Sequence, residues 1–412
     1  MRYLVIFLYL NLACSLHLFA GGNEPTARAI VVHHIQQYYP EQLTNPQKKN
    51  RNTLAQFGYN LSYFTVPIFP ITSFVNPHHF GVHSYSQPGR GEKNGCLYTC
   101  RGGFIDFSHM RAAVDWTVYL AFKILSGTEK IELSPEAGTL KLSFHNLDEL
   151  SDEDIVSMAQ KIAFERLEWH EIASWHYHKP YHFRCDQQST FTPEDTYSNF
   201  LGTVIGKNIA LRILQHLEKK PFAEIATEEI EKKISSLEPV QRKKESKEAY
   251  DIVDRNKQLK LAEDVRNNDV WWDSKILFRD QRYVFKRYIN IGPVVDPWLV
   301  PEAEQLGCDV NPVAEIFPVP ANTEAGISMY DYYSFVIDPD TAMFYGKKNK
   351  QIHTSFSMFN TSEMAQVVKI ISSEMETILM PGFDTRNNCD PTQYYQDLKF
   401  VGPHYTFFQQ RH

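Results

Sequence analysis

The sequence predicts a mainly α fold of the α+β class, with one large helical domain and short peripheral strands. Several long segments place apolar residues three and four positions apart, which is the spacing of one helix face. Alternation of apolar and polar residues is confined to short segments. The length of 412 residues suits one large domain or two ordinary ones, and no internal repeat divides the chain.

The first 22 residues resemble a secretion signal. Arg2 precedes an apolar run over Leu4–Leu12, and small residues follow at Ala20, Gly21 and Gly22. The run is shorter than the roughly 20 apolar residues of a membrane span. We therefore expect an exported protein, periplasmic or secreted, with no transmembrane helix after cleavage. A lipoprotein is the less favoured alternative.

The next part of the chain is expected to hold a short helix, a loop-rich stretch, a long helix and a strand. Residues 27–38 suit the short helix, and residues 57–100 are rich in Pro, Gly and aromatic side chains, which favours extended segments and loops. Ser108 is an acceptable N-cap for a helix that ends at Gly127. Residues 140–144 then alternate as in a strand.

Two further helices follow, each with its own start signal. Ser151 and Asp154 form a capping box in which Asp replaces the usual Glu, and an apolar face continues from there to Ile172. The second helix has Pro193 at its first position and apolar residues as far as Leu217.

Residues 218–266 differ from their surroundings because almost half of them are charged, with acids and bases in similar number. We expect a charged helical insertion that is solvated and contributes little to the core, and a partner-binding helix is the alternative. The single globular domain then comprises residues 23–217 and 267–412. Beyond the insertion, the pattern predicts strands at 282–291 and within 331–346 and a helix at 362–380.

Five cysteines remain after residues 1–22, and an exported chain can oxidise them. Cys308 and Cys389 both lie in turn-rich segments and are the pair that we expect to be joined. Cys96 and Cys100 are expected to be small, semi-buried residues. Because five is odd, at least one thiol is free or bonded elsewhere.

Charge and motifs exclude several classes of function. The net charge of −7 and the isoelectric point near 6.2 argue against a general nucleic-acid binder, which needs a basic face. The chain has no Gly-x-Ser-x-Gly nucleophile elbow and no Walker loop. Nucleotide hydrolysis and α/β-hydrolase chemistry are therefore poorly supported.

Polar side chains gather in three clusters on otherwise apolar helices, where burying a charge is costly unless it is paired, ligates a metal or catalyses. The first cluster places Asp106 and His109 three residues apart at a helix start, with Arg111 just beyond. Asp106 and His109 suit a metal ion. The alternative is that Asp106 caps the helix and that His109 hydrogen-bonds to it.

The second cluster is the adjacent acid and base His170 and Glu171, which lie between two tryptophans. They could act jointly with His109 from another helix, or His170 could be a buried histidine anchored by a carboxylate. A zinc-peptidase helix needs a second histidine four residues further on, where Ser174 stands, so that motif is absent.

The third cluster lies at the first turns of the helix that Pro193 opens. Glu194 and Asp195 suit the positive end of a helix dipole, and Tyr197 and Asn199 add polar density of the kind expected at the floor of a site. His83 is a further metal candidate because it lies close to the first cluster in sequence.

The three clusters give the following assignments. The residues expected in catalysis are Asp106, His109, His170, Glu171 and Asp195; those expected to bind substrate are Arg111, Trp175, Glu194, Tyr197 and Asn199; and those expected to hold a metal are His83, His109 and His170. Zinc is an example of the divalent cation that such ligands would hold.

These clusters resemble an uncharacterised family of exported bacterial proteins, domain-of-unknown-function family 4056. The resemblance rests on Gly95–Asp106 with His109 and Arg111, on Trp169–Trp175 and on Phe191–Asn199, and it spans roughly residues 55–300. It implies no particular activity, and it strengthens the location of the site. The charged segment 218–266 would be a local elaboration.

Two functions are compatible with this sequence. The first is an exported hydrolase that acts on a small molecule or an envelope component through a histidine–carboxylate site, with or without a metal. The second is a non-enzymatic envelope or host-interaction protein whose histidines and carboxylates form a buried structural network.

Overall fold

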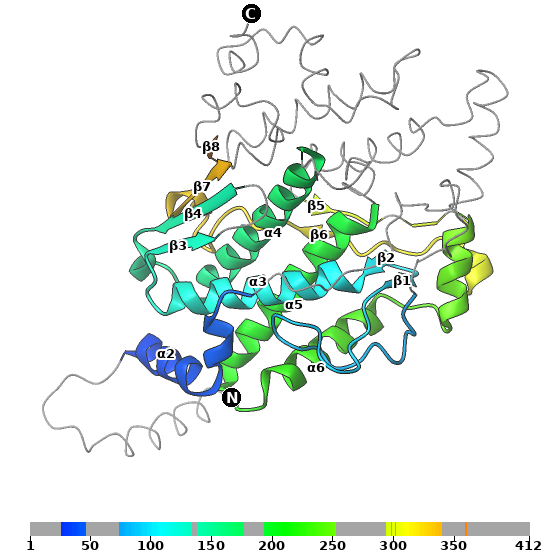
Figure 1. Ribbon diagram of the computed structural model, residues 1–412, viewed down its shortest axis with the longest axis horizontal. Helices are drawn as coiled ribbons and strands as arrows, with labels where there is room; N and C mark the ends of the chain where they lie inside the picture. The colour runs from blue at the N-terminus through cyan, green and yellow to red at the C-terminus, as the bar shows by residue number, and fades with distance from the viewer. Residues whose placement is uncertain are drawn as a thin grey trace, which may run out of the picture.

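The computed structural model confirms a mainly helical α+β architecture (Figure 1). It describes residues 26–46, 74–133, 138–176, 193–252, 294–297, 299–300, 302–339 and 359–360. The expected signal at residues 1–22, the strand at 282–291 and the helix at 362–380 lie outside these ranges.

Three long helices form the centre of the molecule: α3 (Phe107–Leu125), α4 (Asp152–His176) and α5 (Pro193–His216) (Figure 1). Helices α4 and α5 are antiparallel, because their contacts run in opposite directions along the two sequences. From the start of α4 onward these contacts join Ser157 to Lys207, Gln160 to Thr203 and Phe164 to Phe200.

Helices α3 and α5 are parallel and pack closely, because two glycines of α5 face α3. A Cβ atom on Gly202 would lie 2.1 Å from the carbonyl oxygen of Met110, and one on Gly206 would lie 2.7 Å from Cβ of Thr117. Only a residue without a side chain allows this approach of the two backbones. The starts of α3 and α5 therefore lie together at the end of the bundle where α4 finishes.

The sharp start of α4 agrees with the predicted capping box. The Ser151 hydroxyl accepts a hydrogen bond from the backbone N–H of Asp154 at 3.0 Å, and it donates one to Oδ2 of Asp154 at 2.8 Å. Arg28 of α2 (Ala27–Tyr38) binds Asp152 at 2.9 Å, which ties the predicted short helix to the start of α4.

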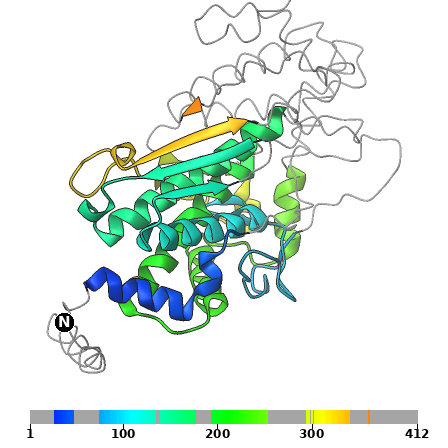
Figure 2. The same ribbon diagram turned by 60° about the vertical axis from the view of Figure 1, so that its left-hand side comes forward.

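An antiparallel sheet lies along one side of the helices, and α2 lies on the other side (Figure 2). Its strands, in spatial order, are β3 (Lys130–Leu133), β4 (Gly138–Phe144), β7 (Tyr333–Pro339) and β8 (Phe359–Asn360). Leu140 and Leu142 of β4 and Ile337 of β7 are buried, so one face of the sheet joins the core. The strand predicted at 140–144 and the first strand predicted within 331–346 are thereby confirmed, and residues 340–346 lie outside the described residues.

A short hairpin leads directly into α3. Strands β1 (Cys96–Thr99) and β2 (Gly103–Asp106) pair antiparallel, and every residue of both is buried. Gly103 has a positive φ of 62°, which a glycine adopts readily at this turn. The remaining small elements are η1 (Pro40–Leu43), η3 (Leu147–Glu149), η5 (Ala303–Leu306), η6 (Met329–Asp331), β5 (Val294–Val295) and β6 (Phe317–Pro318).

The expectation that residues 218–266 are a solvated excursion is wrong for the part that holds α6 (Phe222–Ser236). Phe222, Ile225, Ile230 and Ile234 are buried in the main core at three-to-five-residue spacing. The charges also contribute to packing, since Glu229 is buried and Arg212 of α5 binds three glutamates. These are Glu218, Glu228 and Glu229.

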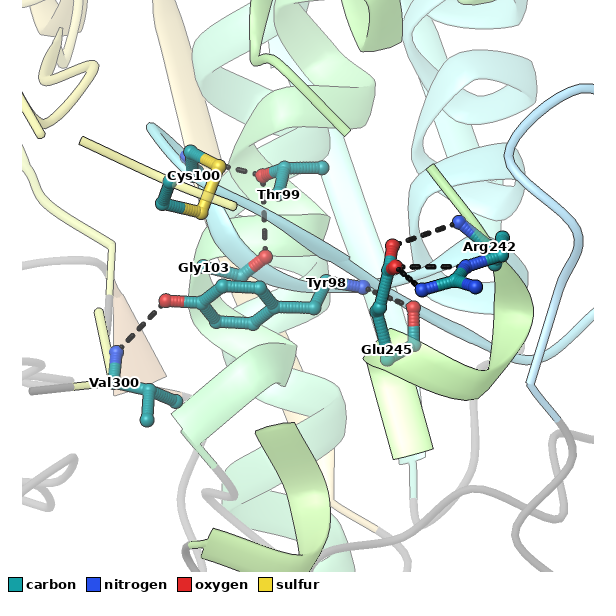
Figure 3. Close-up of a disulfide and its surroundings, with 10 residues drawn as sticks. Tyr98, Thr99, Cys100, Gly103, Arg242, Glu245 and Val300 are labelled. Atoms are coloured by element: carbon teal, nitrogen blue, oxygen red, sulfur yellow. Dashed lines mark hydrogen bonds and ion pairs between the residues drawn. A yellow bond between two sulfur atoms is a disulfide. The ribbon is translucent and has the colours of Figure 1, made fainter. Parts of the chain in front are cut away.

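The expected Cys308–Cys389 disulfide is also wrong. Cys308 is joined to Cys100, which follows β1, and the bond links segments 208 residues apart in sequence. Figure 3 shows its surroundings, where Tyr98 accepts a hydrogen bond from the backbone N–H of Val300 at 2.9 Å. Cys96 is a buried free thiol, and Cys389 lies outside the described residues.

Candidate functional site

Asp106 connects the hairpin to α3. It is the last residue of β2 and the N-cap of α3, in place of the predicted Ser108, and its Oδ1 accepts hydrogen bonds from the backbone N–H groups of Ser108 at 2.6 Å and His109 at 3.3 Å. Its own backbone N–H donates to the hydroxyl of Ser198 in α5 at 2.8 Å. Ser198 thus fixes the backbone of Asp106, the start of α3 fixes Oδ1, and Oδ2 lies 3.6 Å from Nδ1 of His109.

His109 brings two aspartates together, and we call this group the Asp–His–Asp triad. Nδ1 of His109 lies 2.7 Å from Oδ1 of Asp195 and 3.6 Å from Oδ2 of Asp106. One potential ligand atom from each residue lies within 4.8 Å of the other two. Among the described residues this is the group of His, Cys, Asp and Glu side chains that could hold a metal ion. The two aspartates are buried, and the side chain of His109 is 20% exposed.

The backbone favours negative charge at this position. Asp106 caps α3, and Glu194 and Asp195 lie in the first turn of α5, so the positive ends of two helix dipoles meet three carboxylates. Glu194 is as deeply buried as Asp195. The helix ends offset part of the cost of burying these acids, and a bound cation would offset more.

Cys96 lies beside the triad because it pairs with Asp106 across the hairpin. Burial raises the pKa of its thiol well above the ordinary value, and the nearby carboxylates of Glu194, Asp106 and Asp195 raise it further. A metal ligand or nucleophile must be a thiolate. Cys96 therefore stays protonated and acts as a small packing residue, as the sequence analysis expected.

The packing of α4 against α5 places His170 at the same end of the bundle. Contacts join Phe164 to Phe200 and Gln160 to Thr203. Because the two helices are antiparallel, the residues one to two turns after Phe164 in α4 lie level with the start of α5. His170 is partly buried there. Contacts bring Asp106, His109 and Asp195 together, while a common cavity that includes His170 stays a prediction.

Arg166 is a residue that the predicted site did not include, although it lies one turn before His170 on α4. Its guanidinium lies 3.6 Å from the ring centroid of Trp116 in α3, and the residue is 6% exposed. Burial lowers the pKa of Arg166 to about 9. The sequence signal was the four-residue spacing from His170, which puts both side chains on one helix face.

Asn199, which the sequence analysis proposed as a substrate-binding residue, is fully buried one turn after Asp195. Neither its Oδ1 nor its Nδ2 has a hydrogen-bond partner in the part of the chain that the structure describes. A buried amide without partners is costly, so this side chain is suited to a ligand.

Arg111 and His83 form a second polar group on the other side of α3, which we call the loop-anchoring cluster together with Glu92 and Asp115. His83 Nε2 lies 2.9 Å from Asp115 Oδ1, and Arg111 lies 3.4 Å from the other ring nitrogen of His83 and 3.7 Å from Glu92. Arg111 also donates to the carbonyl oxygens of Phe80 and Gly81. The structure does not bring His83 or Arg111 into the triad.

Tyr197 also has a packing position. Its hydroxyl donates to the backbone carbonyl of Glu315 at 3.0 Å, and its ring stacks on Phe317. Burial raises its pKa. Tyr197 therefore anchors β6 to α5. The side chains of Glu171 and Trp175 lie outside the described residues.

The fold and the site define a helical α+β protein with a histidine and two aspartates at the meeting point of two helix starts. Residues 41–301 match the model of the family described as protein of unknown function DUF4056, and the match covers more than half of the chain. The chain belongs to this family. The match also includes α6. No curated protein and no solved structure matches the chain.

No helix in the described ranges combines the length and apolar character needed to cross a membrane.

Proposed function

We propose that this protein is an exported, metal-dependent hydrolase in which Asp106, His109 and Asp195 hold a divalent cation. The observation that carries the proposal is the approach of three potential ligand atoms to within 4.8 Å of one another. They come from the starts of two different helices, and His109 keeps an exposed edge. An open side is what distinguishes a catalytic metal site from a closed structural one.

The donor set fits zinc or manganese. Imidazole nitrogen suits zinc, and carboxylate oxygen suits both zinc and manganese. Three protein ligands leave a position for water, and a bound divalent cation lowers the pKa of that water toward neutrality. In the absence of a cation, Nδ1 of His109 faces two carboxylates across hydrogen-bond and ion-pair distances. A proton and a cation therefore compete for the same place, and binding should weaken as the pH falls.

The other polar residues have supporting roles in this proposal. The N-terminal turn of α3 fixes the carboxylate of Asp106, and Ser198 fixes its backbone. His170, on the α4 side of the same bundle end, is the proposed proton acceptor or donor, with Glu171 beside it in sequence. Glu194 adds negative charge next to the triad and favours a cation there.

Export is supported by two features. The first 22 residues have the pattern of a secretion signal. The Cys100–Cys308 disulfide suits an oxidising compartment, since cytosolic thiols are kept reduced. A periplasmic or secreted location fits a substrate that is a small molecule or an envelope component.

Metal analysis of the purified mature protein tests the proposal. We expect about one zinc or manganese per chain, and removal with a chelator should lower the thermal midpoint until the metal is restored. Asp195→Asn should abolish this metal-dependent rise in the thermal midpoint. Asp152→Asn is the matched control, because Asp152 also lies in the first turn of a helix but binds Arg28 at a distance from the triad. A wild-type protein that binds none of zinc, manganese, magnesium or calcium would contradict the proposal.

The alternative is a non-enzymatic envelope or host-interaction protein, and the loop-anchoring cluster favours it. That cluster shows that this chain does bury histidine and carboxylate groups as packing elements. If the triad has the same role, His109→Gln should destabilise the metal-free protein, and no cation should stabilise the wild type.

A further inference from the structure

Arg166 is buried without a carboxylate partner in the part of the chain that the structure describes. Its guanidinium lies over the face of Trp116, its Nε has no hydrogen-bond partner, and no described carboxylate lies within ion-pair distance of it. An arginine over an indole ring keeps its in-plane N–H groups available for an oxyanion. The cost of burying such a charge is offset if a negatively charged ligand binds it.

Asn199 lies at the same level along the helix bundle as Arg166. Phe164 of α4 packs edge to face against Phe200 of α5, and Arg166 and Asn199 are each one or two residues from that pair, both toward the triad. Since each residue adds ~1.5 Å along a helix, the two side chains start at nearly the same height. Asn199 follows Asp195 by one turn, which puts both on the face of α5 that meets α3.

Trp116 fixes the depth of the guanidinium relative to the triad. It lies two turns after His109 on the same face of α3, and Arg166 covers it. The spacing is about 10 Å along α3 from His109 to Trp116, and about 6 Å along α5 from Asp195 to Asn199. Arg166 and Asn199 therefore lie one to two helical turns further from the starts of α3 and α5 than the triad does.

We propose that Arg166 and Asn199 form an oxyanion subsite beneath the Asp–His–Asp triad, so that the substrate carries a phosphate or carboxylate group about 6–10 Å from the bond that is hydrolysed. This rests on the proposed function. At that separation the anionic group serves recognition and is not the leaving group. A guanidinium presents paired N–H donors to either oxyanion, and an amide N–H adds a third.

The charges around the subsite make anion binding depend on the cation. Asp106, Glu194 and Asp195 give the region a strong negative charge, against which Arg166 is one positive charge. A divalent cation in the triad removes most of this repulsion. An anion should therefore bind more tightly to metal-loaded than to metal-free protein, and by linkage the anion should also tighten the metal.

Calorimetric titration of the full mature protein tests the subsite. Mn²⁺ is titrated first, and then inorganic phosphate and acetate are each titrated into Mn²⁺-loaded and metal-free protein. We expect at least one anion to bind the loaded protein and to bind the metal-free protein more weakly. Binding of phosphate alone indicates a phosphate ester substrate, and binding of acetate alone indicates a carboxylate substrate.

Two variants assign the binding to the subsite. Arg166→Met keeps the side-chain length and removes the charge, and we expect it to weaken anion binding about 10- to 100-fold, the range for losing a charged hydrogen bond. Asn199→Leu is the second variant, and a smaller loss is expected because its hydrogen bond is neutral. Arg212→Met is the matched control, because that arginine is held by three glutamates.

The outcomes separate this inference from the proposed function. If Mn²⁺ binds but neither anion does, or if Arg166→Met and Asn199→Leu bind anions as the wild type does, the subsite is overturned and the metal site stands. If Mn²⁺ does not bind while an anion does and Arg166→Met abolishes it, the subsite stands and the metal proposal falls. If neither binds, both are overturned.

Discussion

Helix α3 contributes to two buried polar groups that differ in how completely their partners enclose them. In the loop-anchoring cluster, the side chains of His83, Glu92 and Arg111 have no exposed surface, and Asp115 has almost none. In the Asp–His–Asp triad, His109 is 20% exposed, and the neighbouring Asn199 keeps two polar atoms without partners in the described ranges.

The difference shows which buried charges of this fold belong to its stability. In the loop-anchoring cluster, both oxygens of Asp115 are used, one by His83 and one by the backbone N–H of Ser86, and Arg111 reaches two carbonyl groups of the same loop. Such a network holds residues 80–94 on α3. The triad and Arg166 lack this enclosure, which is why function is assigned to them.

The largest expected effect is in the loop-anchoring cluster. Asp115→Ala leaves His83 buried without its carboxylate and the backbone N–H of Ser86 without its acceptor, so the free energy of unfolding should fall by about 3–5 kcal/mol. Urea titration measures the change. Asp152→Ala is the control, because its ion pair with Arg28 is about one-third exposed and should be worth less than about 1 kcal/mol.

The Asp115→Ala variant also tests whether the loop-anchoring cluster and the triad act independently. Its thermal midpoint should still rise when a divalent cation is added, because the triad is unchanged. Loss of the cation effect in this variant would mean that the two clusters act as one unit.

The next effect concerns the helix contact that positions Asp195 against His109. In Gly202→Ala the new Cβ would meet the carbonyl oxygen of Met110, so α3 and α5 must separate, with a loss of about 1–3 kcal/mol. Cation affinity, measured by calorimetry, should fall as well. Gly206→Ala is the comparison, because it also clashes with α3 but lies three turns from Asp195. Equal cation affinity in all three proteins would contradict this link between packing and site.

Sequence reasoning located the helices well because their start signals are local. The capping box at Ser151 and the proline at 193 each act within one turn, and α4 and α5 begin there. Asp106 displaced Ser108 as the cap of α3 because its carboxylate, at the end of β2, reaches two backbone N–H groups. That choice depends on the hairpin, which the sequence did not reveal.

Composition misled the interpretation of α6. The high charge suggested a solvated helix, but Ile225, Ile230 and Ile234 form a buried stripe, and a narrow apolar stripe is enough to dock a helix. The Cys100–Cys308 bond was likewise beyond local reasoning, because it joins residues 208 positions apart. Within the site, the approach of Asp195 to His109 depends on the parallel packing of α3 and α5, which spacing alone cannot predict.

A smaller effect, with the opposite sign, is expected at Arg166. If this arginine is retained for a ligand, Arg166→Met should raise the free energy of unfolding by about 1–2 kcal/mol, because it removes a buried charge that has no carboxylate partner among the described residues. The midpoint of urea unfolding in the absence of ligand measures this. A loss of more than about 1 kcal/mol would place Arg166 with the packing residues, as in the loop-anchoring cluster.

The smallest expected effect is a pH dependence of stability that arises from His34. It must be separated from the pH dependence of cation binding at the triad. Burial is the largest cause that lowers the pKa of His34 below its ordinary value, and its Nε2 donates to the carbonyl oxygen of Glu218 at 2.8 Å. The unfolded chain therefore binds the proton more readily than the fold does. The stability from neutral His34 is present above about pH 6.5 and is lost as the pH falls below that value.

His34→Gln should flatten this dependence, with a change of about 1 kcal/mol or less between pH 7 and pH 5. Glutamine can still donate to the Glu218 carbonyl, and it does not titrate. Urea unfolding of metal-free protein at several pH values measures the slope. Cation binding at His109 should weaken as the pH falls, because the imidazole must lose its proton to ligate. In the His34→Gln background, any pH dependence that appears only when the cation is present belongs to the triad. If that dependence persists after Asp195→Asn, it arises elsewhere in the molecule.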